Sequence, residues 1–168
     1  DRAQNWGLQD STSSNGAVYA DLDLDGDLDL VVNNNNQPAL LYENMASEKT
    51  NRNYLIVKGH GKLSESFPKI QLRYDGVQQE IQISRVRGYL SSVENSAHFG
   101  LGIEKKVDTV SILWPSGMYE EKYDVAANQV IEFHEEDAKK RTVPKIQNKK
   151  YVKPLKSGND MIAYKHKE

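Results

Sequence analysis

The chain of 168 residues contains no cysteine, and it has no long apolar run. Without cysteine it can form neither a disulfide nor a thiolate metal site, and it has no cysteine nucleophile. No stretch approaches the roughly 20 consecutive apolar residues that a membrane-spanning helix needs, so we expect no membrane span in this fragment. A signal sequence is also missing and the chain starts at Asp1, which suggests a mature or excised piece of a larger protein.

Positive charge is scarce in the first four fifths of the chain. Residues 1–137 hold 12 basic and 22 acidic side chains, whereas residues 138–168 hold 10 basic and 2 acidic ones. This change of sign at Ala138 predicts a domain boundary. The basic tail has only two aromatic residues for base stacking, Tyr151 and Tyr164, so we interpret it as a linker and expect no nucleic-acid partner.

Residues 1–48 are rich in Asn, Asp, Gly and Ser and contain three short apolar runs, at 17–20, 28–32 and 39–42. This pattern predicts three strands joined by tight turns. A small antiparallel unit of this kind cannot bury both of its faces alone. It needs neighbours, as one blade of a β-propeller does.

The middle of the chain alternates between apolar and polar residues, and no window has the 3.6-residue period of an amphipathic helix. The alternation predicts strands at 54–57, 69–74, 77–87, 97–101, 107–114, 118–125 and 129–134. Short strands at this spacing are typical of a β-sandwich. We therefore predict an all-β fold, with a sandwich of about seven strands that follows the N-terminal unit.

The run DLDLDGDLD at residues 21–29 predicts a calcium-binding loop. Calcium takes six to eight oxygen ligands, and a glycine at the sixth position allows the sharp turn that such loops make. The candidate ligands are the side chains of Asp21, Asp23 and Asp25, the backbone carbonyl of Asp27, and the side chain of Asp29. Five neighbouring carboxylates would repel one another without a cation.

The loop is not an EF-hand, because Val32 stands where the bidentate Glu would be and strands are expected on both sides. We therefore expect a structural calcium ion rather than a regulatory one. Magnesium is a poorer fit because it resists dehydration and demands a rigid octahedron. The alternative is a solvated acidic turn that binds no metal.

Other side chains give weaker signals. None of the four histidines, His60, His98, His134 and His166, has the sequence spacing of a zinc site, and we expect His98 to be packed and hydrogen-bonded in a strand. No catalytic triad or catalytic metal motif is recognisable, so we expect no enzyme activity. Arg87, Tyr89 and Trp114 are candidate residues for a ligand-binding surface. For Trp114 we favour a buried indole over stacking on a carbohydrate, and for Tyr89 we favour a supporting role in the core.

Two regions resemble known families. Residues 15–44 resemble the FG-GAP or VCBS repeat of integrin-like β-propellers, and this likeness implies the same calcium ligands. Residues 53–134 resemble the ASPIC and UnbV domain, which follows such a propeller in the cartilage acidic protein family and in bacterial surface proteins. The motifs that carry the second likeness are Gly88-Tyr89-Leu90-Ser91-Ser92, His98-Phe99-Gly100-Leu101-Gly102, Trp114-Pro115-Ser116-Gly117 and Ala127-Asn128-Gln129.

The resemblance implies three segments: a calcium-binding blade fragment at 1–48, an ASPIC and UnbV-like sandwich at 53–137, and a basic linker with the start of a following module at 138–168. It implies a non-enzymatic, extracellular scaffold or binding module, at the cell surface or in a bacterial envelope. The expected partners are neighbouring propeller domains, with a glycan or another surface protein as further candidates. The alternative function is a carbohydrate-binding accessory part of a glycan-handling protein.

Overall fold

The computed structural model describes residues 3–8, 10–50, 52–61 and 67–141. The first part of it is an antiparallel sheet with the strand order β1-β2-β3, which we call the N-terminal sheet. Its strands are β1 (Ser14–Ala20), β2 (Asp29–Asn34) and β3 (Leu40–Tyr42). A 3-10 turn, η1 (Gln4–Trp6), precedes the sheet, and a short helix, α1 (Ala46–Thr50), follows it. The three strands expected here are confirmed.

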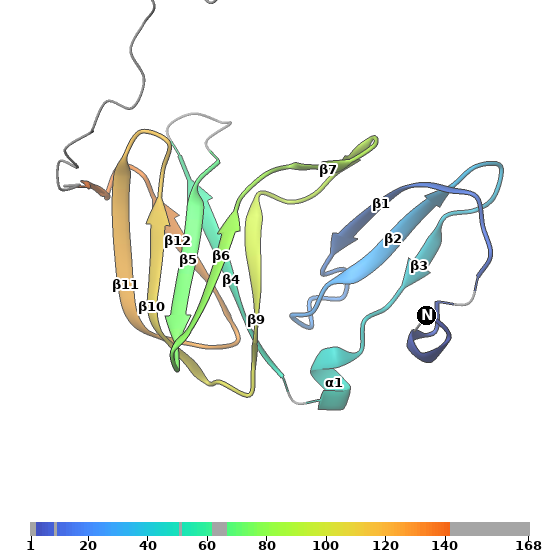
Figure 1. Ribbon diagram of the computed structural model, residues 1–168, viewed down its shortest axis with the longest axis horizontal. Coiled ribbons are helices and arrows are strands. Elements are labelled where there is room, and N and C mark those ends of the chain that lie inside the picture. Colours follow the sequence, from blue (N-terminus) through green and yellow to red (C-terminus); the bar gives the residue numbers. More distant parts are fainter. Residues whose placement is uncertain (1–2, 9, 51, 62–66, 142–168) are drawn as a thin grey trace, which may run out of the picture.

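Two further sheets form the sandwich (Figure 1). The larger has the order β13-β11-β10-β5-β6, and the smaller has the order β12-β4-β9. The strands of the larger sheet are β5 (Lys69–Tyr74), β6 (Val77–Gln82), β10 (Lys106–Leu113), β11 (Met118–Ala126) and β13 (Lys139–Lys140). Those of the smaller are β4 (Asn53–His60), β9 (Ser96–Gly102) and β12 (Gln129–His134). The predicted all-β fold is therefore confirmed.

The sandwich core lies between these two sheets because apolar residues alternate along each strand. In β5, Ile70 and Leu72 are fully buried, and Leu55 and Val57 of β4 are fully buried on the facing sheet. Fully burying a side chain of this size stabilises the fold by roughly 1.5–3 kcal/mol. The period of two thus fixes which face of each strand points inward.

One expected strand is divided in the structure. We predicted a continuous strand over 77–87, but β6 ends at Gln82, and β7 (Val86–Gly88) pairs instead with β8 (Ser91–Ser92). The apolar alternation at Ile81 and Ile83 loses its phase at Val86, which is 72% exposed. The chain leaves the sheet there and forms a separate hairpin.

The predicted boundary at Ala138 is also wrong by a few residues. Ala138 is only 7% exposed and belongs to the core, and β13 pairs with the start of β11. The Arg141 guanidinium lies 5.3 Å from the centre of the Tyr119 ring. Charge alone suggested a linker because the basic side chains of this strand lie on the outside of the sandwich. The rest of the predicted linker and following module lies outside the described residues.

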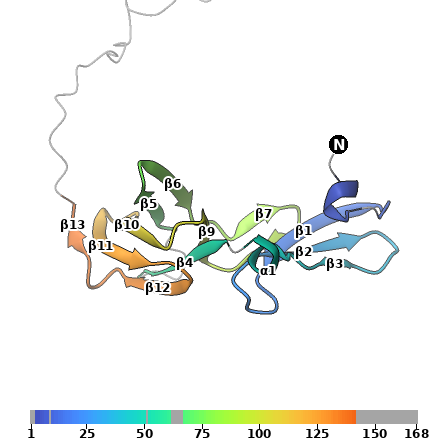
Figure 2. The ribbon, with the colours of Figure 1, turned by 90° about the horizontal axis from the view of Figure 1, so that it is seen from below.

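The N-terminal sheet lies beside the sandwich, and the β7–β8 hairpin reaches across to β1 (Figures 1 and 2). A Cβ atom added to Gly16 of β1 would lie 3.1 Å from the Tyr89 carbonyl oxygen, so the two backbones approach closely. No helix within the described ranges is long and apolar enough to cross a membrane.

Candidate calcium site

The predicted calcium loop connects β1 to β2 at the side of the N-terminal sheet that faces the sandwich. Its backbone turns at two residues in the left-handed region, Leu24 with φ of 64° and Gly26 with φ of 95°. A glycine adopts such a φ without the steric cost that a side chain adds. The one glycine of the loop therefore occupies the position with the larger of the two positive φ angles.

The loop brings three carboxylates together. Asp21, Asp23 and Asp25 each offer an oxygen, and these atoms all lie within 4.8 Å of one another. Two oxygens on opposite sides of a calcium ion are about 4.6–5.2 Å apart, since each Ca–O distance is 2.3–2.6 Å. The spacing of the three carboxylates is therefore compatible with one shared ion.

Backbone amides of the loop point back toward these side chains. The Gly26 amide donates to Oδ2 of Asp21 at 3.2 Å, and the Asp25 amide donates to Oδ1 of Asp23 at 3.3 Å. The Asp27 amide donates to Oδ1 of Asp25 at 2.9 Å. In each bond a backbone amide donates to one oxygen of a carboxylate, and this fixes the direction in which the carboxylate points.

Asp25 also receives a hydrogen bond from outside the loop. The Ser47 hydroxyl of helix α1 donates to its Oδ2 atom. This bond, followed by the one from the Asp27 amide, holds the pKa of Asp25 below its ordinary value. The carboxylate is thus kept in the ionised form that a metal ion binds.

Asp29 and Asp27 lie outside the group of three. Asp29 is buried, and its two oxygens accept the Leu22 amide at 3.0 Å and the Asn44 amide at 2.8 Å. The Asp27 side chain accepts the Ser47 amide at 2.9 Å. These two carboxylates tie the loop to the segment that follows β3, so of the four predicted side-chain ligands the structure groups three.

A metal ion would satisfy an acceptor that the described protein atoms leave alone. Oδ1 of Asp21 is buried and has no hydrogen-bond partner among the described residues, and the same holds for Oδ1 of Asp27. A buried oxygen without a donor is costly, more so when it carries charge. A cation at the three carboxylates would compensate the Asp21 oxygen directly.

The loop rests against the sandwich through Gly26. Its carbonyl oxygen lies 2.7 Å from Nε2 of His98, which must carry the proton because a carbonyl can only accept. The His98 ring stacks on Tyr54 with ring centres 5.8 Å apart. A Cβ atom at Gly26 would lie 1.9 Å from Cε1 of Tyr54. Gly26 is thus required by its φ and also by its neighbour.

His98 is hydrogen-bonded in strand β9, in agreement with the prediction for this residue. The hydrogen-bond partner of His98, and the contacts that Tyr54 and Ser47 make with the loop, were not predicted from the sequence. These contacts join segments that are far apart in the chain, and no local pattern signals them.

The candidate ligand-surface residues do not form one surface. The favoured interpretation of Trp114 as a buried indole is confirmed, because the side chain is 1% exposed inside the core, and the alternative of carbohydrate stacking is wrong. The expected core role of Tyr89 is wrong, because its side chain is 70% exposed; it lines a pocket together with residues of β1 and β2. Arg87 lines a different cavity and lies over the Tyr19 ring at 5.9 Å.

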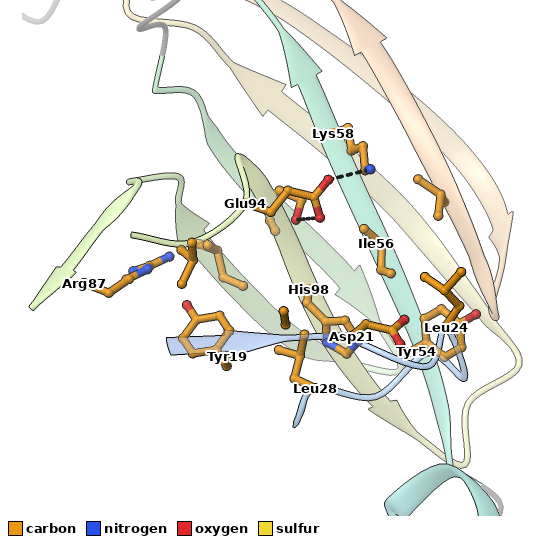
Figure 3. Close-up of a pocket in the computed structure, with 16 residues that line it drawn as sticks. Tyr19, Asp21, Leu24, Leu28, Tyr54, Ile56, Lys58, Arg87, Glu94 and His98 are labelled. Atoms are coloured by element: carbon orange, nitrogen blue, oxygen red, sulfur yellow. Dashed lines mark hydrogen bonds and ion pairs between the residues drawn. The ribbon is translucent and has the colours of Figure 1, made fainter. Parts of the chain in front are cut away.

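The cavity at Arg87 has a volume of about 340 Å³ and lies between the N-terminal sheet and the sandwich (Figure 3). Arg87 and Tyr19 line one part of it, and the ion pair between Lys58 and Glu94, 2.6 Å long, lines another. Asp21 of the acidic loop between β1 and β2 also contributes to its wall. The cavity therefore combines aromatic, cationic and anionic groups.

Residues 68–140 match the ASPIC and UnbV family model. The ASPIC and UnbV match begins just before β5 and ends with β13, so it includes every strand of the larger sheet together with β9 and β12. The N-terminal sheet and its acidic loop lie outside it. No curated protein matches the sequence significantly.

Proposed function

We propose that this chain is a non-enzymatic, extracellular scaffold or binding module, stabilised by calcium, within a larger multi-propeller surface protein. The ASPIC and UnbV match supports a surface-protein module. The observation that carries the calcium part is the convergence of Asp21, Asp23 and Asp25, with one buried oxygen of Asp21 lacking a partner among the described residues. The role of calcium is structural.

The ion would act on the junction between the N-terminal sheet and the sandwich. Binding three carboxylates fixes the loop, and the same loop presents the Gly26 carbonyl to His98. An ion that binds only the folded loop stabilises it by mass action, by about 2.7 kcal/mol at a concentration 100 times its Kd. Calcium would thus hold the N-terminal sheet and the sandwich in one relative orientation.

Exposed apolar side chains support a neighbouring propeller domain as the partner. Trp6 of η1 is 72% exposed, and Leu41 of β3 is 65% exposed. A small sheet with exposed apolar residues gains stability when a neighbour covers it. We assign these residues to contacts with adjacent blades of the parent protein.

Calorimetry tests the structural role of calcium. The melting temperature of the chain is measured in EDTA and in millimolar calcium, with magnesium at the same concentration as the comparison. We expect calcium to raise the melting temperature and magnesium to raise it much less, because the loop favours a large and flexible coordination sphere. Identical melting curves in EDTA and calcium would refute the proposal.

The cavity between the N-terminal sheet and the sandwich favours a second candidate function, carbohydrate binding. Sugars bind through aromatic faces and paired polar groups, and the cavity offers Tyr19, Arg87 and Glu94. A glycan screen compares the parent chain with Arg87→Ala, since Arg87 also holds the Tyr19 ring. Binding that the substitution abolishes would favour this function, and equal binding by the two chains would place the glycan elsewhere.

A further inference from the structure

The outer face of the smaller sheet carries a second group of side chains of the types that can hold a metal ion. Strands β4 and β12 run parallel, and their register places His134 beside His60. Because alternate residues of a strand share a face, Glu132 lies on the same side as His134. We call His60, Glu132 and His134 the histidine cluster. Their sequence spacing gives no zinc motif, since the fold brings two distant strands together.

The side chains of the histidine cluster converge. Nε2 of His60 lies 3.4 Å from Oε2 of Glu132. The rings of His60 and His134 stack with their centres 4.7 Å apart and their planes 14° apart. One ligand atom from each of the three residues lies within 4.8 Å of the other two. All three residues are exposed, which leaves room for a further ligand from solvent.

We propose that the histidine cluster is a binding site for a divalent transition metal, with Zn²⁺ as the ion to test. Tetrahedral zinc with ligands at about 2.0–2.2 Å has ligand atoms roughly 3.3–3.6 Å from one another. The measured 3.4 Å between His60 and Glu132 has this value. Two imidazoles and one carboxylate form a three-ligand set that leaves the fourth position to water.

The neighbouring charges leave the carboxylate of this cluster accessible. Lys58 is the register partner of Glu132, but its ammonium lies 2.6 Å from Glu94 instead. Lys122 donates to the backbone carbonyl of Glu132 and lies 4.4 Å from the centre of the Phe133 ring. Among the described ion pairs, Glu132 takes part only in the one with His60. A metal ion would replace that pair without displacing a lysine.

The histidine cluster is separate from the calcium loop in position and in chemistry. The loop contacts Tyr54 near the start of β4, and six residues of strand at about 3.3 Å each place His60 roughly 20 Å away. The loop offers only oxygen, which suits calcium, whereas imidazole nitrogen suits zinc. The two sites should therefore select different ions.

Titration calorimetry with ZnCl₂ tests this inference on the full chain. The buffer contains millimolar calcium, so that calcium occupies any oxygen site. We expect one zinc ion to bind. Removing a direct ligand, in His60→Ala or His134→Ala, should weaken binding by at least the roughly 10- to 100-fold that loss of an outer-shell partner costs a metal site.

His166→Ala is the matched control, because it removes one imidazole of the same chain outside the cluster. We expect its zinc affinity to equal that of the unaltered chain. Glu132→Gln keeps the shape of the side chain but removes its charge, and it should weaken zinc binding too. Cobalt provides a second readout, since tetrahedral Co²⁺ absorbs strongly in the visible range. The inference is overturned if the unaltered chain binds no zinc. It is also overturned if His134→Ala and Glu132→Gln both bind zinc as tightly as the unaltered chain.

Discussion

The carbonyl oxygen of Gly26 and Nε2 of His98 are separated by 72 residues in the sequence and by 2.7 Å in the structure. Gly26 is the residue at which the acidic loop turns, and His98 belongs to the smaller sheet of the sandwich. The conformation of the loop and its docking on the sandwich therefore depend on the same residue. Any change that alters the loop should also alter how the N-terminal sheet is held.

Gly26→Ala should be strongly destabilising. The left-handed conformation costs a non-glycine residue roughly 1–2 kcal/mol. The new methyl group would also meet the Tyr54 ring, whose Cε1 atom is 1.9 Å from the position of the added carbon. Overpacking of this kind costs about 1–3 kcal/mol more. Urea unfolding in calcium and in EDTA measures the total loss.

Gly76→Ala is the control for the backbone part of this effect. Gly76 has a φ of 72°, and a Cβ atom there would meet no atom within 4 Å. It should lose only the conformational part and keep its response to calcium. A Gly26→Ala/Tyr54→Ala double variant removes the Tyr54 ring and should relieve the clash. Its loss of stability should therefore be smaller than the sum of the losses in the single variants Gly26→Ala and Tyr54→Ala. Equal losses in Gly26→Ala and Gly76→Ala would contradict the docking contact.

Asp23→Asn tests the loop as a calcium site. Asp23 is exposed, so its substitution should leave the fold intact. Calcium affinity depends on the number of charged ligands, and we expect a loss of roughly tenfold or more. Asp108→Asn removes an exposed carboxylate from strand β10 and serves as the control. Calcium titration by calorimetry should separate the two; equal affinities would show that Asp23 is no ligand.

The strands of the sandwich other than β13 could be predicted because each carries a local signal. Ile70 and Leu72 alternate with polar residues, and Asp75-Gly76 then turns the chain with positive φ at both positions. The pairing of β12 with β4 could not be predicted in the same way. Parallel pairing joins strands that no short turn connects, so the local sequence contains no record of it.

In the acidic loop, too, local features could be predicted from the sequence and long-range contacts could not. The spacing of Asp21, Asp23 and Asp25 was enough to predict that their carboxylates converge. The alternation of side chains in an extended segment and the turn at the glycine both depend on only a few neighbouring residues. The hydrogen bonds of Asp29 to the Leu22 and Asn44 amides depend on where the chain returns after β3. The sequence alone has no pattern for that return. Calcium binding itself stays a prediction.

Ser47→Ala should raise the pKa of Asp25 toward its ordinary value, since the hydroxyl of Ser47 is the main cause of the lowered pKa. With a lowered pKa in the folded state, the stabilisation from Asp25 is present above the ordinary pKa. It is lost as the pH falls through the folded pKa. NMR titration of the Asp25 carboxyl carbon in EDTA measures the shift. Ser84→Ala, whose hydroxyl bonds to the Val86 carbonyl, should leave the Asp25 titration unchanged.

The two tryptophans allow a direct comparison between the core and the surface. Trp114 is 1% exposed and Trp6 is 72% exposed. Trp114→Ala should destabilise the sandwich by roughly 3–5 kcal/mol because it leaves a large cavity between the sheets. Trp6→Ala should change the free energy of unfolding by no more than about 0.5 kcal/mol, as surface substitutions usually do. Urea unfolding followed by far-UV circular dichroism measures both without depending on tryptophan fluorescence. Comparable losses in the two variants would mean that Trp6 also packs against the folded chain, and the open surface assigned to a neighbouring domain would then be wrong.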